Sequence, residues 1–236
     1  MTVGSFAAAG VDAPELFDTI LAAARPRLDE CSGHNLANLA FALSCAEWKD
    51  PDLLAAVAAA SAPKVSAMSS DELSQLHLAA LHFRLEWADR SFPLSPCQDV
   101  LEAAHRRSAS THLPAQRDVA RALNRIGWTH VASHVTEEGL ILPMAQPDAK
   151  RAVIVHGRRR FLKDVVSGEY VETGHARFEP RLLRRLGWDV VTVPFFEWQR
   201  SKQTRDEDAY VKSKVGAWMD VDPDASSAEA PASSSS

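Results

Sequence analysis

The sequence predicts an α-helical segment followed by a mixed α/β module, which together give an α plus α/β fold class. Residues 14–104 are rich in Ala and Leu at helical spacing, as Leu36, Leu39 and Leu43 illustrate. In residues 105–215, short β-branched runs alternate with amphipathic helices. The chain of 236 residues is long enough for two such units.

Charge divides the chain in the same way. Residues 1–104 carry 6 Lys and Arg against 14 Asp and Glu, whereas residues 105–202 carry 17 against 10. A basic half within a chain of net charge −5 points to nucleic acid or another polyanion as its partner. The alternative is a mixed, solvated surface.

Several classes of protein are disfavoured. No run of about 18 apolar residues occurs, so we expect no membrane span and no membrane partner. The cysteines Cys31, Cys45 and Cys97 include no C-x-x-C pair, which argues against disulfides and structural zinc and implies a reducing compartment. His130 and His134 have helical spacing but no accompanying ligand cluster. We therefore predict neither a metal nor a cofactor.

The two ends have compositions typical of disorder. Residues 1–13 are small, and residues 216–236 end in a Ser- and Ala-rich tract, so we expect both to be disordered. Asp12 and Glu15 precede the first arginine, Arg25, whereas transit peptides are rich in Arg and poor in acids. The sequence thus has no clear transit peptide.

Two helices in the first half resemble each other. Residues 33–42 align with residues 70–79 at an offset of 37, and Trp48 and Trp87 follow at similar distances. A period of this length is typical of an α-solenoid; a helical bundle with chance similarity is the alternative. About two copies are fewer than an independent solenoid needs, so we expect this half to lean on the C-terminal module or on a partner.

The first of these helices also resembles a known class of repeat. Asn35 to Leu43 is similar to the octotricopeptide-like and FAST-kinase-like repeats of organellar RNA proteins, with Phe41 at an aromatic position. The resemblance implies a role in organelle gene expression.

The second half predicts a mixed sheet with flanking helices. Gln116 to Ile126 has one apolar and one basic face, and Gly127 closes it. The four predicted strands span residues 131–135, 140–142, 152–155 and 188–194. A second helix, predicted over residues 179–186, lies between the last two strands.

These residues resemble the RAP domain, an RNA-binding domain abundant in apicomplexans. The resemblance spans residues 151–214 and includes the strand 152–157 with Phe161. Its most specific part is Gly-Trp-x-Val-Val-x-Val-Pro-x-x-x-Trp over residues 187–198, and the closing helix includes residues 208–211. It implies a restriction-endonuclease-like fold for a module of residues 105–215.

Nucleases of that fold hold a metal ion with acidic residues on two adjacent strands. Here the corresponding strand reads Ile154, Val155 and His156 before Gly157, and residues 140–142 offer only Leu and Ile. An Ile cannot ligate Mg²⁺, and one His does not replace hard oxygen ligands. We therefore predict a vestigial nuclease site at Ile154, His156 and Gly157, without catalytic residues and without enzymatic activity.

Positive charge follows this strand directly. Arginine suits bidentate contact with phosphate and stacking on bases; the alternative is that these side chains are solvated surface arginines. Trp188 and Trp198 are expected in the core, which leaves Phe196 as the candidate platform for a base. The predicted RNA-binding residues are Arg158, Arg159, Arg160, Lys163, Arg177, Arg181, Arg184, Arg185 and Phe196.

The sequence and the resemblance together predict an organellar RNA-binding protein, in the mitochondrion or alternatively in a chloroplast or other plastid. Its expected roles are RNA processing, stability, ribosome assembly or translation, with ribosomal or RNA-processing proteins as further partners. One alternative is a structural protein of an organellar ribosome, which binds rRNA permanently. Another is an RNA endonuclease that uses Asp148 or Glu169, the nearest carboxylates in sequence. The RNA target and the oligomeric state are not encoded in any recognisable pattern.

Overall fold

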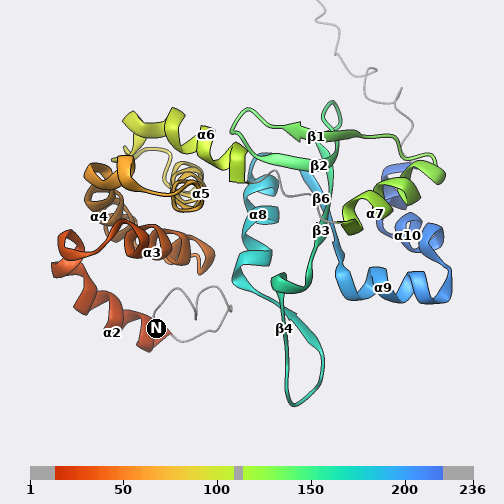
Figure 1. Cartoon of the computed structure of the whole chain (residues 1–236), viewed down its shortest axis with the longest axis horizontal. Coiled ribbons are helices and arrows are strands. Elements are labelled where there is room, and N and C mark those ends of the chain that lie inside the picture. Colours follow the sequence, from red (N-terminus) through yellow and green to blue (C-terminus); the bar gives the residue numbers. More distant parts are fainter. Residues whose placement is uncertain (1–13, 109–113, 220–236) are drawn as a thin grey trace, which may run out of the picture.

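The computed structural model describes residues 14–108 and 114–219, which form a helical half (14–108) and an α/β module (114–219) packed against each other (Figure 1). The disorder expected for residues 1–13 lies outside the described residues, as does most of the expected C-terminal tail. Residues 216–219 correct that expectation because they continue the last helix. No described helix combines the length and apolarity needed to cross a membrane.

The helical half begins its main helices with serine caps. The Ser32 hydroxyl accepts a hydrogen bond from the backbone N–H of Asn35, and Ser69 forms a reciprocal capping box with Glu72. The half consists of α2 (Pro14–Ala24), η1 (Arg25–Glu30), α3 (Gly33–Cys45), α4 (Pro51–Ser61), η2 (Ala62–Ala67), α5 (Ser70–Glu86), η3 (Ser95–Cys97) and α6 (Gln98–Ser108). Helix α6 runs from Gln98 to Ser108 and therefore spans the predicted division between residues 104 and 105.

The two helices predicted to be copies, α3 and α5, pack side by side. They begin at Gly33 and Ser70, 37 residues apart, as the alignment indicates. Gln75 Nε2 donates a hydrogen bond to Asn38 Oδ1 at 3.1 Å, so residues at equivalent positions of the two helices contact each other.

The module contains the predicted mixed sheet. Its order is β1-β2-β3-β6, with β1 and β3 antiparallel to β2, and β3 parallel to β6. The elements are α7 (Pro114–Arg125), β1 (Val131–Val135), β2 (Ile141–Gln146), β3 (Arg151–His156), η4 (Arg158–Arg160), β4 (Phe161–Lys163), β5 (Tyr170–Glu172), α8 (Gly174–Arg185), β6 (Asp189–Pro194), α9 (Phe195–Thr204) and α10 (Glu207–Met219).

Several element bounds differ from the sequence prediction, and the larger shifts have local causes. Strand β2 extends to Gln146 rather than ending at residue 142. Helix α8 begins at Gly174, five residues before the predicted start at residue 179, because the Thr173 side chain caps it. Strand β6 begins after Trp188, whose N–H is still bonded to Leu183 O in the turn that ends α8.

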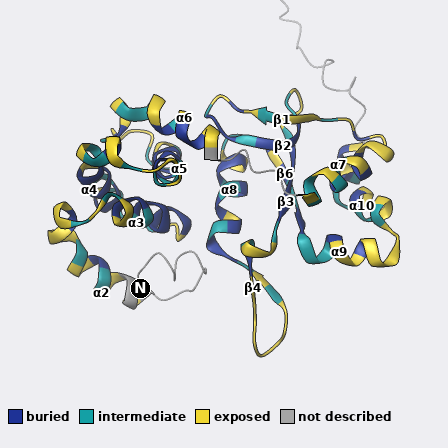
Figure 2. Cartoon of the chain, in the orientation of Figure 1, coloured by how far each residue is buried: buried dark blue, intermediate teal, exposed yellow. Residues whose placement is uncertain are grey.

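The sheet lies between two layers of helices. Ala152 and Ile154 of β3 pack on the side of α8, whereas Val153 and Val155 pack against α7, α9 and α10. This alternation confirms that β3 is buried on both faces, as its unbroken apolar run predicts. Figure 2 shows the dark blue of buried residues concentrated where these layers meet.

Helix α8 also carries the contact with the helical half. Phe41 and Cys45 of α3 and Leu81 of α5 belong to the same buried cluster as Phe178 and Leu182 of α8. The prediction that the helical half leans on the module is therefore confirmed. Burial of Cys45 in this contact raises the pKa of its thiol to about 12.

Beyond the sheet, β4 and β5 form a hairpin that projects from the body of the molecule (Figure 1). Its turn holds Val165 and Val166, which are 97% and 94% exposed.

Candidate nucleic-acid interface

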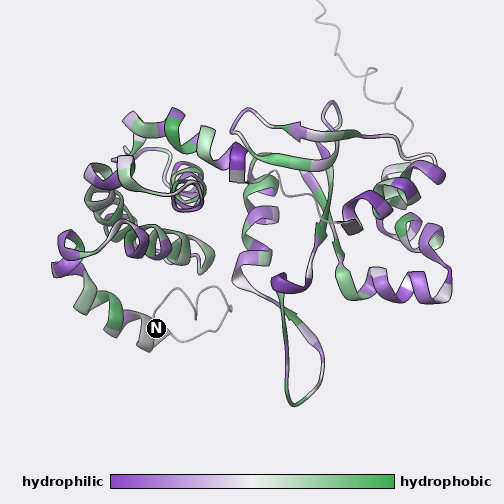
Figure 3. Cartoon of the chain, viewed as in Figure 1, coloured by the Kyte–Doolittle hydropathy of each residue, from purple (hydrophilic) through white to green (hydrophobic). Residues whose placement is uncertain are grey.

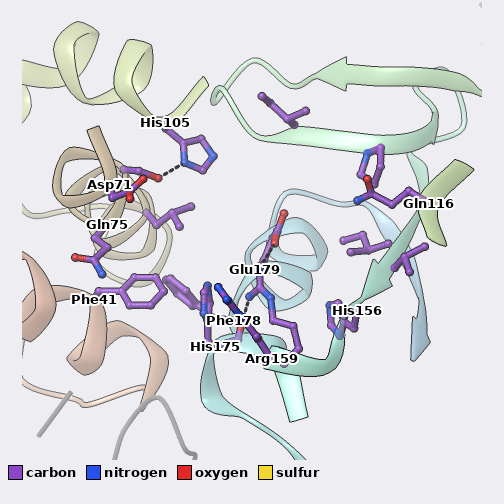
Figure 4. A pocket seen from close by; sticks show the side chains of 18 of the residues that line it. Phe41, Asp71, Gln75, His105, Gln116, His156, Arg159, His175, Phe178 and Glu179 are labelled. Atoms are coloured by element: carbon purple, nitrogen blue, oxygen red, sulfur yellow. Dashed lines mark hydrogen bonds and ion pairs between the residues drawn. The ribbon is translucent and has the colours of Figure 1, made fainter. Parts of the chain in front are cut away.

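A cleft of ≈730 Å³ lies where the helical half faces the carboxyl end of β3 (Figure 4). The sheet supplies its floor and the helical half supplies one wall. The residues that form the floor and this wall include Ile141, Ile154, His156, Phe41, Gln75 and Leu78. Since both parts contribute, neither part alone contains the complete cleft.

The predicted vestigial nuclease site forms part of this cleft. Ile154, His156 and Gly157 all line it, and Ile141 and Pro143 of the neighbouring strand β2 lie beside them. The two adjacent strands thus present apolar side chains and one imidazole to the cleft, and no carboxylate.

His156 is buried without a hydrogen-bond partner. It is 2% exposed, and neither ring nitrogen makes a hydrogen bond among the described residues. Nδ1 lies 3.5 Å from Glu172 Oε1, but the geometry is not that of a hydrogen bond. Burial, reinforced by the positive charge of Arg160, lowers the pKa of His156 to about 4. The ring is therefore neutral at neutral pH and forms no ion pair with Glu172.

The two carboxylates kept for a nuclease alternative lie away from the cleft. Asp148 is in the turn before β3, at the opposite end of that strand from His156, and Glu169 is in the turn of the projecting hairpin. Asp71 and Glu179 line the cleft instead. Within residues 14–108 and 114–219, no three His, Cys, Asp or Glu side chains form a group that could hold a metal ion.

Arg158 and Arg159 rim the cleft immediately after β3, in one of the most hydrophilic segments of the chain (Figure 3). Both side chains are exposed and make no hydrogen bond or ion pair within the described residues. Lys163 on β4 and Arg177 on α8 are likewise exposed and unpaired there. These four cations are therefore available to an anionic ligand.

The family comparison agrees with this geometry. The model of the RAP domain matches residues 155–214, from the end of β3 into α10. The chain contains a RAP domain. RAP domains are generally associated with RNA binding. No curated protein matches the chain.

Two arginines of the RAP domain, predicted as RNA contacts, face the helical half instead. The Arg181 guanidinium is bonded to the backbone oxygen of Ser44 and lies 2.8 Å from Glu47, and its side chain is only 17% exposed. Arg185 is paired with Glu86 at 3.0 Å. Acidic residues and a helix end of the first half therefore occupy both guanidinium groups in this RNA-free structure.

Two further arginines are bound within the RAP domain. Arg184 donates to the backbone oxygen of Val190 at 3.1 Å. Arg160 donates to His175 O at 2.8 Å and is paired with Glu179 at 3.4 Å. Arg160 therefore shapes the cleft wall, whereas its neighbours in η4 stay free.

Phe196 belongs to an aromatic cluster at the base of the hairpin. Its ring is stacked on Tyr170 with centroids 4.8 Å apart and meets Phe161 edge-on at 5.2 Å. It does not line the cleft, so the structure separates it from the arginine rim and assigns one ring face to hairpin packing. Trp188 and Trp198 are buried, as expected for core residues.

Sequence reasoning missed the contribution of the helical half. Phe41 and Leu78 both line the cleft, and they occupy equivalent positions 37 residues apart in the two similar helices. His175 on α8 was also missed; burial lowers its pKa to about 3. The internal alignment contained the signal for the first pair, because equivalent positions on packed repeats share a face.

Proposed function

We propose that this protein binds single-stranded organellar RNA, in the mitochondrion, and supports its processing, stability, ribosome assembly or translation without cleaving it. The RAP domain supports the RNA partner. The resemblance of the helical half to repeats of organellar RNA proteins supports the compartment and the process.

One observation carries the proposal: Arg158 and Arg159 are exposed and unpaired at the rim of a cleft whose floor has lost acidic character. Guanidinium groups match phosphate geometry with two parallel hydrogen bonds. They follow a buried strand of the sheet, so the backbone behind them is rigid. A phosphate bound there would not have to displace an existing ion pair.

Binding without cleavage is supported by the side chains beside these arginines. Phosphodiester hydrolysis of the nuclease type needs oxygen ligands for Mg²⁺. Ile141 and Ile154 offer no ligand atom, and Asp148 lies at the other end of β3. Magnesium-dependent shortening of the RNA during a binding assay would contradict this part of the proposal.

The test is a salt series of equilibrium binding to a labelled single-stranded oligoribonucleotide, comparing the native chain with the double variant Arg158→Ala/Arg159→Ala. If each arginine neutralises one phosphate, the slope of log affinity against log salt becomes shallower by about 1.4, because each single-strand phosphate contributes roughly 0.7. The double variant Arg200→Ala/Lys212→Ala is the matched control, since it removes two exposed charges from α9 and α10. Equal slopes for the native chain and the η4 variant would overturn the proposal.

The compartment and process need a separate measurement. Fractionation of cells that express the tagged full chain should place it with mitochondrial RNA. Stable co-sedimentation with a ribosomal subunit at high salt would instead identify a permanent ribosomal component.

A further inference from the structure

The charges of the cleft differ in sign between its rim and its walls. Arg158 and Arg159 lie at the rim, whereas the carboxylates of Asp71 and Glu179 line the walls, and Glu179 is already paired with Arg160. A phosphate deep in the cleft would meet these carboxylates. A neutral group attached to a phosphate would not be repelled by these carboxylates, provided that the phosphate stays at the rim.

The interior has the surfaces that a flat, neutral ring needs. Phe41 meets His175 edge-on with centroids 4.9 Å apart and Phe178 at 5.5 Å, so aromatic groups form the wall near α8. Leu78 adds apolar surface from α5. Phe178 is fully buried and supports Phe41, which is 9% exposed and lines the cleft, so contact of a base with this wall would be apolar and tolerate any base.

His156 gives this interior its unsatisfied hydrogen-bonding capacity. A neutral imidazole carries one donor and one acceptor, and both nitrogens of His156 are buried without a partner. Leaving such a group unpaired in the buried state is unfavourable, so a ligand that pairs with it removes part of this cost. The two nitrogens point in diverging directions, so the edge of one nucleobase can pair with one of them.

The size of the cleft agrees with a ligand of this class. A volume of ≈730 Å³ falls within the ~300–1,000 Å³ typical of small-ligand sites and is too small for a double helix. Gln75 also lines the cleft. Its Nε2 donates the hydrogen bond to Asn38, so its side-chain carbonyl oxygen takes no part in that bond.

We propose that the cleft between the helical half and the RAP domain holds one unstacked nucleotide of single-stranded RNA, its base bonded to His156 and its phosphate at Arg158 and Arg159. This inference rests on the proposed RNA binding and specifies the site. The base enters between Phe41 and the end of β3. The helical half therefore contributes directly to RNA contact.

Photocrosslinking tests the position of the base. The full chain is mixed with an oligouridylate that carries one 4-thiouridine, irradiated, and mapped by mass spectrometry. We expect crosslinks in the peptides that contain Phe41 and His156. Leu78→Trp fills the cleft without a change of charge, so it should abolish these crosslinks and leave the salt slope of binding unaltered.

The variant His156→Phe tests the hydrogen bond. It keeps a ring of similar size, so we expect oligouridylate affinity to fall about three- to tenfold, the value of one net hydrogen bond. The melting temperature of the RNA-free protein should not fall, because two unpaired buried nitrogens are removed. His134→Phe, on β1 outside the cleft, is the matched control and should bind as the native chain does.

The two proposals fail in different ways. If affinity depends on Arg158 and Arg159 but crosslinks lie elsewhere, or if His156→Phe binds unchanged, the nucleotide site is wrong and RNA binding at the rim stands. If the arginine variant binds with an unaltered salt slope, the proposed function is itself wrong.

Discussion

Along α8 the helical half and the RAP domain are in direct contact, whereas beyond the end of β3 they enclose an open cleft. Both regions contain arginines and buried histidines. Arg181 is bonded to Ser44 and Glu47 at the direct contact, but Arg158 at the cleft has no protein partner among the described residues. The helical half thus occupies Arg181 through Ser44 and Glu47, whereas Arg158 remains for a ligand.

The largest expected effect is a fall in the free energy of unfolding at acidic pH, to which buried histidines of both regions contribute. Burial lowers the pKa of His77, His82, His105 and His156 to about 4, and that of His175 to about 3. In the unfolded chain these rings titrate near 6.5, so between pH 6.5 and about 4 the unfolded state binds more protons. Stability is therefore highest above pH 6.5 and falls as the pH drops through this window, by about 1.4 kcal/mol per pH unit for each histidine.

Urea unfolding at stepwise pH measures this dependence. His82→Phe at the direct contact and His156→Phe at the cleft should each reduce the slope of unfolding free energy against pH by the contribution of one histidine. A curve that stays level between pH 6.5 and 4.5 would contradict the neutral, buried state of these rings.

The next largest effect is a difference in unfolding free energy between variants of Arg181, at the direct contact, and of Arg158, at the cleft. Arg181→Ala leaves Ser44 O and Glu47 without their partner and removes the guanidinium from the Phe178 ring, so we expect the free energy of unfolding to fall by about 2–3 kcal/mol. Arg158→Ala should change it by no more than about 0.5 kcal/mol, since its side chain is exposed. Chemical denaturation of both variants makes the comparison, and equal losses would remove the distinction between the two regions.

The smallest effect concerns Arg185. Its side chain is 53% exposed in the pair with Glu86, and solvent screens such pairs. Arg185→Ala should therefore cost less than about 1 kcal/mol in unfolding free energy. It should leave RNA affinity unchanged after correction for the folded fraction, which the same salt series measures. A loss of affinity as large as that of the η4 variant would restore Arg185 to the RNA interface.

The sequence was sufficient for the sheet but not for the cleft. Alternation of helices and β-branched runs predicted β3 and β6 closely, because a strand buried on both faces needs an uninterrupted apolar run. It could not separate Arg158 from Arg181, since the partners of Arg181 lie more than a hundred residues away, at Ser44 and Glu47. Long-range pairing of this kind leaves no local pattern. The wall formed by Phe41 depends on the same packing of the two halves.

The buried thiol of Cys45 has a further consequence for the contact along α8. Reagents that alkylate cysteine attack the thiolate, and a pKa raised to about 12 leaves almost none of it while α3 rests on α8. Cys31 and Cys97, in contrast, are partly exposed. Alkylation at Cys45 therefore tracks separation of the two halves, and the native chain already contains a chemical probe for how often its RAP domain detaches.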